Sequence, residues 1–405
     1  MKYIGLSSSK VYGIKVLPFY LLTFLLFSLT GCIEEFEAEV PEDESNLLVV
    51  EGTIYSGKQC TFTLSWTDPI NGYAEPRWST EAQISVRGTD GSVYETEGGY
   101  GKYTCQLGDL NPDVEYYLHI EVDGDVYESN PQKPLRTEKI ADVRGVQESQ
   151  ESDINILLTP AEPFDNSKTN YYSWTYDETW EVRPEYTTVI AFVPQGIDKG
   201  ECVVTGNLWP ERGWKDQASE TVMIGSSNSY EGQHIQQMKL YEVDHSSQRM
   251  FYKYSSLIHQ RAISKGEYEY EKARMQASED MGGLFTPQPS ALPSNIHCKT
   301  SKKRAIGYIG CSLNTSEYRL FLVDKDFYIE RPRKKSDLVV VDEPTVTDCI
   351  KLVNNGLYLV DWNDERYMGG ILQTTWAYRY QLDVTIYGCY TEKPDYWDST
   401  ENISY

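Results

Sequence analysis

The residues that could carry out catalysis do not fall into spacings that support it. The five histidines are scattered along the chain, at His119, His234, His245, His259 and His297. None belongs to an H-E-x-x-H motif, and the G-x-S-x-G elbow, the Walker loop and the G-x-G-x-x-G turn are missing. Asp361, Asp364 and Glu365 lie close together in the chain, but a glycosidase needs two carboxylates held across a cleft. The sequence therefore predicts no catalytic residues.

Aromatic side chains suggest a second kind of site, because flat rings stack on the apolar faces of sugars. The chain has 32 tyrosines and 9 tryptophans. The candidates for an exposed ligand platform are Tyr172, Trp174, Tyr176 and Trp180, in and just after a predicted strand. The competing interpretation, which we favour, is a packed core, since β-strands favour aromatic residues and large rings fill interiors well.

The first 31 residues have the composition of an export signal peptide. A basic start precedes an apolar stretch over residues 16–29, which is too short to span a bilayer comfortably. The stretch ends in Leu29-Thr30-Gly31-Cys32, which resembles the bacterial lipoprotein box. This resemblance implies cleavage after Gly31 and a lipid on the thiol of Cys32, whose acyl chains would hold the protein on a membrane. The alternative is an ordinary signal peptide with a chance cysteine.

The acidic charge balance narrows the classes of partner. The chain has 37 Lys and Arg against 61 Asp and Glu, with a formal net charge of −24. Nucleic acid is disfavoured, because a phosphate-binding surface needs basic residues. Seven of residues 33–46 are acidic, so the segment 32–46 is predicted to be an extended tether behind the lipidated cysteine. Its acidity also resembles the surface-export signal of Bacteroidetes lipoproteins, although a solubilising linker would look the same.

Export would make disulfides the favoured role for the remaining seven cysteines. The candidate pairs are Cys60 with Cys105, Cys298 with Cys311, and Cys349 with Cys389, which leaves Cys202 over. Cys60 and Cys105 both fall in predicted strands of one sandwich and could bridge its sheets. Spacing does not determine connectivity, so the pairs are hypotheses. Zinc is the competing role, but the chain has no C-x-x-C pair, so we predict no metal site.

The length of 405 residues allows two domains, each able to bury a core. Residues 47–137 alternate short β-like runs with turn signals, the pattern of a β-sandwich. The clearest strand covers residues 116–122, in which every second residue is apolar. Residues 110–116 resemble the corner of fibronectin type III domains, where a tyrosine hydroxyl bonds back to the backbone. We therefore expect an immunoglobulin-like sandwich, a fold that carries no function by itself.

Residues 138–405 predict a larger, mainly-β domain with one or two helices. Strand candidates are residues 172–176, 187–193, 305–312, 318–323, 338–341 and 381–386. A helix is predicted near residues 264–280, because Ser264 and Glu267 form a capping box. Gly282-Gly283 would end this helix. The overall fold class is therefore predicted to be mainly β, or β-rich α+β.

Several segments together resemble one protein family. They are LLVVEGTI at residues 47–54, ISKGEYEYEKARMQASEDMGGLF at 263–285, PQPSALPSNI at 287–296, GYIGCS at 307–312 and CYTEKPDYW at 389–397. The set resembles the Bacteroidetes outer-membrane lipoproteins catalogued as domain of unknown function 4249. The resemblance implies an outer-membrane lipoprotein of a kind often encoded beside TonB-dependent receptors, and it supplies no catalytic residues.

We therefore expect a non-enzymatic, lipid-anchored protein of the outer membrane, exposed at the cell surface and without a cofactor. The preferred function is an accessory to a TonB-dependent nutrient receptor. One alternative is a stand-alone glycan- or peptide-binding adhesin, which would present one contiguous patch of exposed aromatics. A less favoured alternative is a surface hydrolase, which would bring two carboxylates, or a nucleophile and a base, into one pocket. The basic cluster Lys302-Lys303-Arg304 is expected to be a solvated hairpin tip.

Overall fold

The computed structural model covers most of the chain after the predicted tether. The described residues are 46–67, 77–79, 81–183, 191–192, 202–203, 212–279, 292–331, 339–341, 357–361, 376–380, 392–399 and 401–404. Several predicted features lie outside them, namely Gly31, Cys32, Gly282-Gly283, Cys349, Asp364, Glu365, residues 381–386 and Cys389. Those predictions stay predictions.

The first nine strands form two facing sheets around one core. One sheet contains β1 (Leu48–Tyr55), β2 (Gln59–Trp66), β7 (Lys102–Gln106) and β6 (Glu97–Gly99), with β3 (Arg77–Trp78) beside β2. The other contains β9 (Asp125–Ser129), β8 (Tyr116–Val122), β4 (Ala82–Gly88) and β5 (Val93–Glu95). The main strands divide between the sheets as strands A, B and E against C, F and G do in an immunoglobulin-like sandwich.

Local sequence signals explain how the sandwich is built around β8. The side chains of Tyr116, Leu118, Ile120 and Val122 are all buried, as the alternation predicts. The backbone N–H of Asn111 donates to the Tyr116 hydroxyl at 3.0 Å, which confirms the predicted tyrosine corner. Asp123-Gly124 connects β8 to β9 with φ angles of 50° and 80°, the left-handed geometry of a tight hairpin turn.

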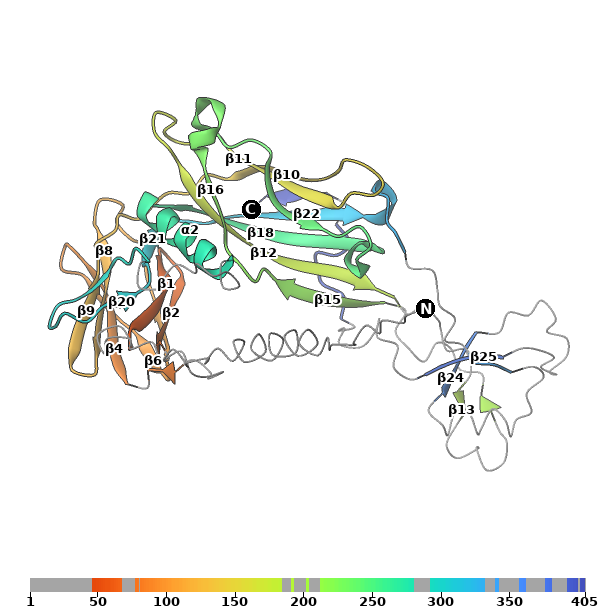
Figure 1. Cartoon of the computed structure of the whole chain (residues 1–405), viewed down its shortest axis with the longest axis horizontal. Helices are drawn as coiled ribbons and strands as arrows, with labels where there is room; N and C mark the ends of the chain where they lie inside the picture. The colour runs from red at the N-terminus through yellow and green to blue at the C-terminus, as the bar shows by residue number, and fades with distance from the viewer. Residues whose placement is uncertain are drawn as a thin grey trace, which may run out of the picture. The chain divides into compact units, whose positions relative to one another are not determined.

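A segment far downstream returns to complete the sandwich. The sequence predicts that residues 296–312 belong to the second domain, yet their strands pair with those of the sandwich. The strands are β19 (Ile296–Cys298), β20 (Ala305–Ile306) and β21 (Gly310–Ser312). β19 runs antiparallel to β9, whereas β20 and β21 run parallel to β1. Figure 1 shows β20 and β21 beside β1. Ile296, Ala305 and Ile309 accordingly belong to the sandwich core.

The rest of the described chain builds a second core between two further sheets. The larger sheet has the order β15 (Gly213–Ala218), β12 (Tyr171–Val182), β18 (Lys253–Ile263), β22 (Ser316–Val323) and β26 (Ile403–Ser404), with β16 (Met223–Ser226) beside β12. The smaller sheet has the order β10 (Ile140–Gln147), β11 (Ile154–Pro160) and β17 (Met238–Val243). Inward-facing residues of both sheets, such as Val143, Ile156, Trp174 and Tyr254, pack together.

Short elements account for the remaining regular structure of the described residues. Two small sheets contain β13 (Ala191–Phe192) with β14 (Cys202–Val203), and β23 (Val339–Val341), β25 (Trp376–Tyr380) and β24 (Leu357–Asp361). The 3₁₀ turns are η2 (Ser227–Ser229), η3 (Glu231–Gln233), η4 (Gln248–Met250) and η7 (Asp324–Asp326). The fold is mainly β, as predicted.

The α-helix of the described chain is α2 (Lys265–Glu279), at the predicted position. The Glu267 backbone N–H donates to Ser264 Oγ at 3.1 Å, so Ser264 caps the helix as expected. The Glu267 carboxylate turns toward Arg261 at the end of β18. Figure 1 shows α2 beside β12 and β16. Among the described residues, no helix has the length and apolar character needed to span a membrane.

Two of the segments that carry the chain between the two cores are bonded to each other. We call residues 135–140 and 310–316 the double crossing. The Leu135 N–H donates to the Cys311 carbonyl at 3.0 Å, and the Leu313 N–H donates to the Leu135 carbonyl at 2.8 Å. The Asn314 side chain accepts from the Thr137 N–H at 3.0 Å and donates to the Thr137 carbonyl at 2.9 Å. These bonds join the two β-rich parts at a fixed point.

Replacing Asn314 should weaken this joint. Asn314→Ala removes both bonds to the backbone of buried Thr137, so we expect the free energy of unfolding to fall by about 1–2 kcal/mol. Urea denaturation followed by tryptophan fluorescence measures the change. Asn228→Ala, at an exposed position in η2, is the matched control and should change stability by less than about 0.5 kcal/mol. Equal effects of the two variants would contradict the role given to Asn314.

Candidate functional site

The aromatic residues predicted as an exposed platform are core residues instead. The exposed fractions of Tyr172, Trp174 and Trp180 are 2%, 1% and 8%. Tyr176 is half-buried and stacks on Tyr241, with ring centroids 3.9 Å apart. The platform prediction is therefore wrong. Alternation along β12 correctly placed these rings on one face, but that face is covered by the three-stranded sheet.

Two of the three predicted cysteine pairs are not disulfides in this structure, and the third, Cys349 with Cys389, lies outside the described residues. Cys60, Cys105, Cys298 and Cys311 are all free thiols. Cys60 and Cys105 face each other across β2 and β7, which are neighbours in one sheet, so the expectation that they bridge the two sheets is wrong. Cys298 and Cys311 lie on β19 and β21, at the edges of different sheets. Cys202 lies in β14.

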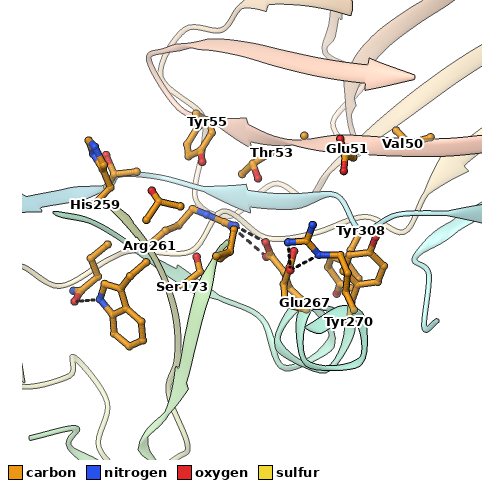
Figure 2. A pocket seen from close by; sticks show the side chains of 18 residues that line it. Val50, Glu51, Thr53, Tyr55, Ser173, His259, Arg261, Glu267, Tyr270 and Tyr308 are labelled. Carbon is orange, nitrogen blue, oxygen red and sulfur yellow. Dashed lines mark hydrogen bonds and ion pairs between the residues drawn. The ribbon is translucent and has the colours of Figure 1, made fainter. Parts of the chain in front are cut away.

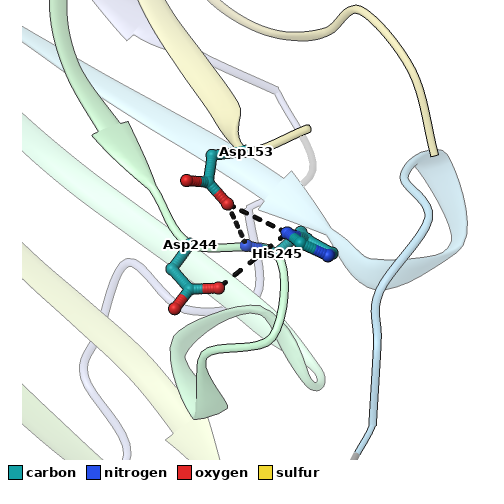
Figure 3. Close-up of side chains that lie close together, drawn as sticks. All are labelled: Asp153, Asp244 and His245. Atoms are coloured by element: carbon teal, nitrogen blue, oxygen red, sulfur yellow. Dashed lines mark hydrogen bonds and ion pairs between the residues drawn. The ribbon is translucent and has the colours of Figure 1, made fainter. Parts of the chain in front are cut away.

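One histidine cluster has the residue types of a metal site. Ligand atoms of Asp153, Asp244 and His245 lie within 4.8 Å of one another (Figure 3). However, His245 Nδ1 is hydrogen-bonded to Asp153 Oδ1 at 2.9 Å. Asp244 Oδ1 accepts from both the N–H and the hydroxyl of Ser246, each at 2.7 Å. Because these atoms are already used in protein hydrogen bonds, we assign the cluster to fastening the turn after β17 to the start of β11.

A pocket of about 290 Å³ lies where β1 meets β12, β18 and α2. We call it the seam pocket. Its principal polar residues are Glu51, Thr53 and Tyr55 from β1, His259 and Arg261 from β18, Glu267, Tyr270, Glu271 and Arg274 from α2, and Tyr308. Figure 2 shows Glu51, Thr53 and Tyr55 on the β1 side, and Arg261 reaching toward Glu267. The pocket therefore lies between the immunoglobulin-like sandwich and the larger sheet.

Two ion pairs set the electrostatics of the seam pocket. Arg261 forms a fork with Glu267, with Nη1 3.2 Å from Oε2 and Nη2 2.5 Å from Oε1. Burial, the largest single influence, lowers the pKa of Arg261, but the charge and hydrogen bond of Glu267, together with Tyr55 and Glu271, outweigh it and raise that pKa. Gly310 makes room for the pair, because a Cβ there would collide with the Glu267 carboxylate. Arg274 Nε donates to Glu271 Oε2 at 2.9 Å, so both arginine charges are neutralised within the protein.

The uncharged polar groups of the pocket can both donate and accept hydrogen bonds. Burial raises the pKa of Tyr270 to about 12, and burial also raises the pKa of Tyr308. Both phenols therefore keep their protons at neutral pH. His259, at the pocket, contacts Asp177 at 3.0 Å and Glu317 at 3.3 Å through its two ring nitrogens. These carboxylate contacts leave His259 poorly placed to activate a hydroxyl, so the described lining suits binding better than nucleophilic catalysis.

Sequence comparison assigns this architecture to a family. The family described as Domain of unknown function (DUF4249) matches residues 33–318. The chain belongs to this family. The match includes β1, β12, β18 and α2, so all walls of the seam pocket are within the DUF4249 region. No curated protein shows significant similarity to the chain.

Residues 393–397 have the sequence Lys-Pro-x-x-Trp and lie beyond the DUF4249 match. They have a structural role. Trp397 is buried and meets the Trp214 ring edge-on, with centroids 6.2 Å apart. Its indole N–H donates to Glu181 Oε2 at 3.2 Å. The Arg319 guanidinium lies 3.6 Å from the centroid of the neighbouring Tyr396 ring. These contacts attach Tyr396 and Trp397 to the larger sheet.

Sequence reasoning missed the seam pocket almost entirely. It found Glu267, but only as the acidic member of a helix cap. The signal for a further role was Arg261, six positions earlier, because an arginine at the end of a strand can reach the first turn of the following helix. The other walls come from distant parts of the chain, so no local spacing connects them.

The basic cluster Lys302-Lys303-Arg304 is not wholly solvated, since Lys303 Nζ lies 2.7 Å from Asp125 Oδ2. Asp361 ends β24.

Breaking the Arg261–Glu267 pair should cost substantial stability. The side chains are 14% and 6% exposed, so Glu267→Gln leaves a nearly buried guanidinium without a counter-charge. We expect a loss of about 3 kcal/mol in the free energy of unfolding, measured by urea denaturation. Glu269→Gln on the same helix is the control. Its pair with Lys265 is exposed, so the loss should be about 0.5 kcal/mol or less. A loss for Glu267→Gln no larger than for the control would contradict the counter-charge role given to Glu267.

The His245 contact should make stability depend on pH. The Asp153 carboxylate raises the pKa of His245, and the His245 contact lowers the pKa of Asp153. A raised histidine pKa adds stability below about pH 6.5 that is lost as pH rises through the folded pKa. A lowered aspartate pKa adds stability above about pH 3.9 that is lost in stronger acid.

His245→Gln should therefore destabilise the protein more at pH 5.5 than at pH 8.5, as measured by denaturant titration at both values. His297→Gln, at an exposed position, is the control and should show a smaller pH dependence. A cost of His245→Gln that is independent of pH, or that grows as pH rises, would refute this assignment.

Proposed function

We propose that this DUF4249 protein is a lipid-anchored, surface-exposed protein of the outer membrane that acts as a non-enzymatic accessory to a TonB-dependent nutrient receptor. Three sequence features support the proposal: the apolar signal over residues 16–29, the Leu29-Thr30-Gly31-Cys32 ending and the acidic segment that follows. The resemblance to Bacteroidetes outer-membrane lipoproteins supports the location and the partner class.

The observation that carries the binding role is the seam pocket with its internally paired charges. Its walls come from both β-rich parts, and the double crossing holds these parts together. Ion pairs already hold the charged side chains of the pocket in place, so binding a ligand costs little side-chain conformational entropy. Binding, rather than covalent chemistry, is the activity that this arrangement favours.

In the proposed mechanism, the lipid on Cys32 confines the protein to the membrane surface. Confinement raises its effective concentration beside a receptor in the same membrane. The acidic segment 33–46 would extend the folded part away from the bilayer, because a chain of this charge resists collapse. A ligand held in the seam pocket would then be released close to the receptor.

The adhesin alternative loses its original basis, because the four aromatics that would have formed its platform are buried or half-buried. The hydrolase alternative would require a nucleophile and a base, or two carboxylates, in one pocket. Among the described residues of the seam pocket, the carboxylates of Glu267 and Glu271 are each engaged with an arginine, and Glu51 accepts a hydrogen bond from Thr63, so no two carboxylates are free to act as a pair. We therefore retain the accessory function as the proposal.

Purification from native membranes tests this function. Affinity-tagged protein is isolated from gently solubilised outer membrane, and co-purifying proteins are identified by mass spectrometry. We expect a β-barrel receptor in stoichiometric amounts with the natural protein and with Cys298→Ala, a control that removes a thiol outside the lipid site. Cys32→Ala should lose both the membrane anchor and the receptor. Recovery of the natural protein alone, or retention of the receptor by Cys32→Ala, would contradict the proposal.

A further inference from the structure

The seam pocket has the size and position of a site for one small ligand. Its volume of about 290 Å³ is near the lower end of the range of roughly 300–1,000 Å³ that is usual for ligand pockets. Its walls are a strand face of the sandwich, a helix face and the ends of two strands of the larger sheet. Polar groups thus converge on one space from three directions, as in sites that orient a small molecule.

The ion pairs of the pocket disfavour a charged ligand. A ligand carboxylate would have to compete with Glu267 for Arg261, and that pair is a nearly buried fork. A ligand ammonium would compete with Arg274 for Glu271, 2.7 Å from Arg274 Nη2, but this pair is half-buried and costs less to separate. Separating the nearly buried Arg261–Glu267 pair leaves one charge without its partner, which opposes binding of an anion. A neutral ligand avoids this cost.

The remaining polar groups match a ligand rich in hydroxyls. The phenol of Tyr270 and the hydroxyl of Thr53 each offer one donor and acceptor lone pairs, whereas the Tyr308 hydroxyl is already bonded to Ser264 Oγ at 3.0 Å. Glu51 is exposed and accepts from Thr63 Oγ1 at 3.1 Å, and a carboxylate has lone pairs for further donors. The rings of Tyr55 and Tyr270 add apolar surface beside these groups. A sugar combines the same features, because its hydroxyls donate and accept while its ring carries apolar C–H faces.

We propose that the seam pocket binds a neutral, hydroxyl-rich small molecule of the saccharide class. This inference rests on the proposed function and deepens it, since it names the chemical class of the captured ligand. It assigns Tyr270 and Thr53 to direct ligand contact. The nearly buried Arg261–Glu267 pair disfavours a negatively charged competitor.

Ligand-observed NMR on the full-length protein tests the proposal directly. The protein is held in a detergent without a sugar headgroup, and saturation-transfer difference spectra are recorded with five probes. The neutral probes are D-glucose, D-galactose and N-acetyl-D-glucosamine, and the charged probes are D-glucuronate and D-glucosamine. We expect saturable binding of at least one neutral probe, about tenfold or more tighter than that of either charged probe.

Two matched variants locate the binding. Thr53→Leu adds apolar bulk to the pocket wall and should abolish the neutral-probe signal. Thr61→Leu makes the same change at an exposed threonine of the neighbouring strand β2, outside the pocket lining, and should keep the signal. Near-ultraviolet circular dichroism confirms that both variants fold. A third variant, Tyr270→Phe, keeps the ring but removes the hydroxyl and should weaken binding about fivefold or more, the loss of one hydrogen bond.

Three results would overturn the inference: no binding of any neutral probe, charged probes that bind as tightly as neutral ones, or a signal that survives Thr53→Leu. Receptor co-purification is measured without added sugar, so its result does not depend on the ligand. The accessory function and the saccharide ligand can therefore be refuted independently. A protein that retains its receptor but binds no neutral probe would refute only the ligand class. A protein that binds a neutral sugar in the seam pocket but has no receptor would refute only the accessory role.

Discussion

The arrangement of this protein depends on the double crossing, in which residues 135–140 and 310–316 are bonded side by side. The outgoing passage carries the chain from the sandwich to the larger sheet, and the second passage runs between β21 and β22. A single connection would leave the two parts free to swing, whereas two bonded connections restrict rotation. The seam pocket has walls on both sides of this joint, so its shape follows from that restriction.

Buried polar groups extend the same constraint into the second core. Glu138 is only 6% exposed, yet its carboxylate accepts from the Tyr172 hydroxyl at 3.0 Å and from the Phe164 N–H at 2.9 Å. Its backbone carbonyl accepts from Gln260, which in turn accepts from the Trp174 indole at 2.9 Å. Burying a carboxylate is costly unless such partners are present. The network thereby fixes β12 against β18 and gives the aromatic residues of β12 a structural role.

Local patterns predicted the local structure well. The alternation in residues 116–122, the tyrosine at position 116 and the Ser264 cap each depend on neighbours in sequence, so their structural consequences could be derived directly. Long-range pairing could not be. Nothing near residues 296–312 indicates that they pair with β1 and β9, because short strands of this kind fit many sheet edges. For the same reason, alternation showed that Tyr172 and Trp174 share a face but not that another sheet covers it. The seam pocket escaped prediction because its walls are distant in sequence.

The central claim is that the sandwich and the larger sheet form one unit joined at the double crossing. Native-state hydrogen exchange, followed by mass spectrometry of peptides that cover residues 135–140 and 310–316, tests it most directly. If the joint is intact, these amides should exchange as slowly as those of β2 and β12, through unfolding of the whole unit. Rapid exchange at the crossing while both cores stay protected would show two independently moving parts and would contradict the account.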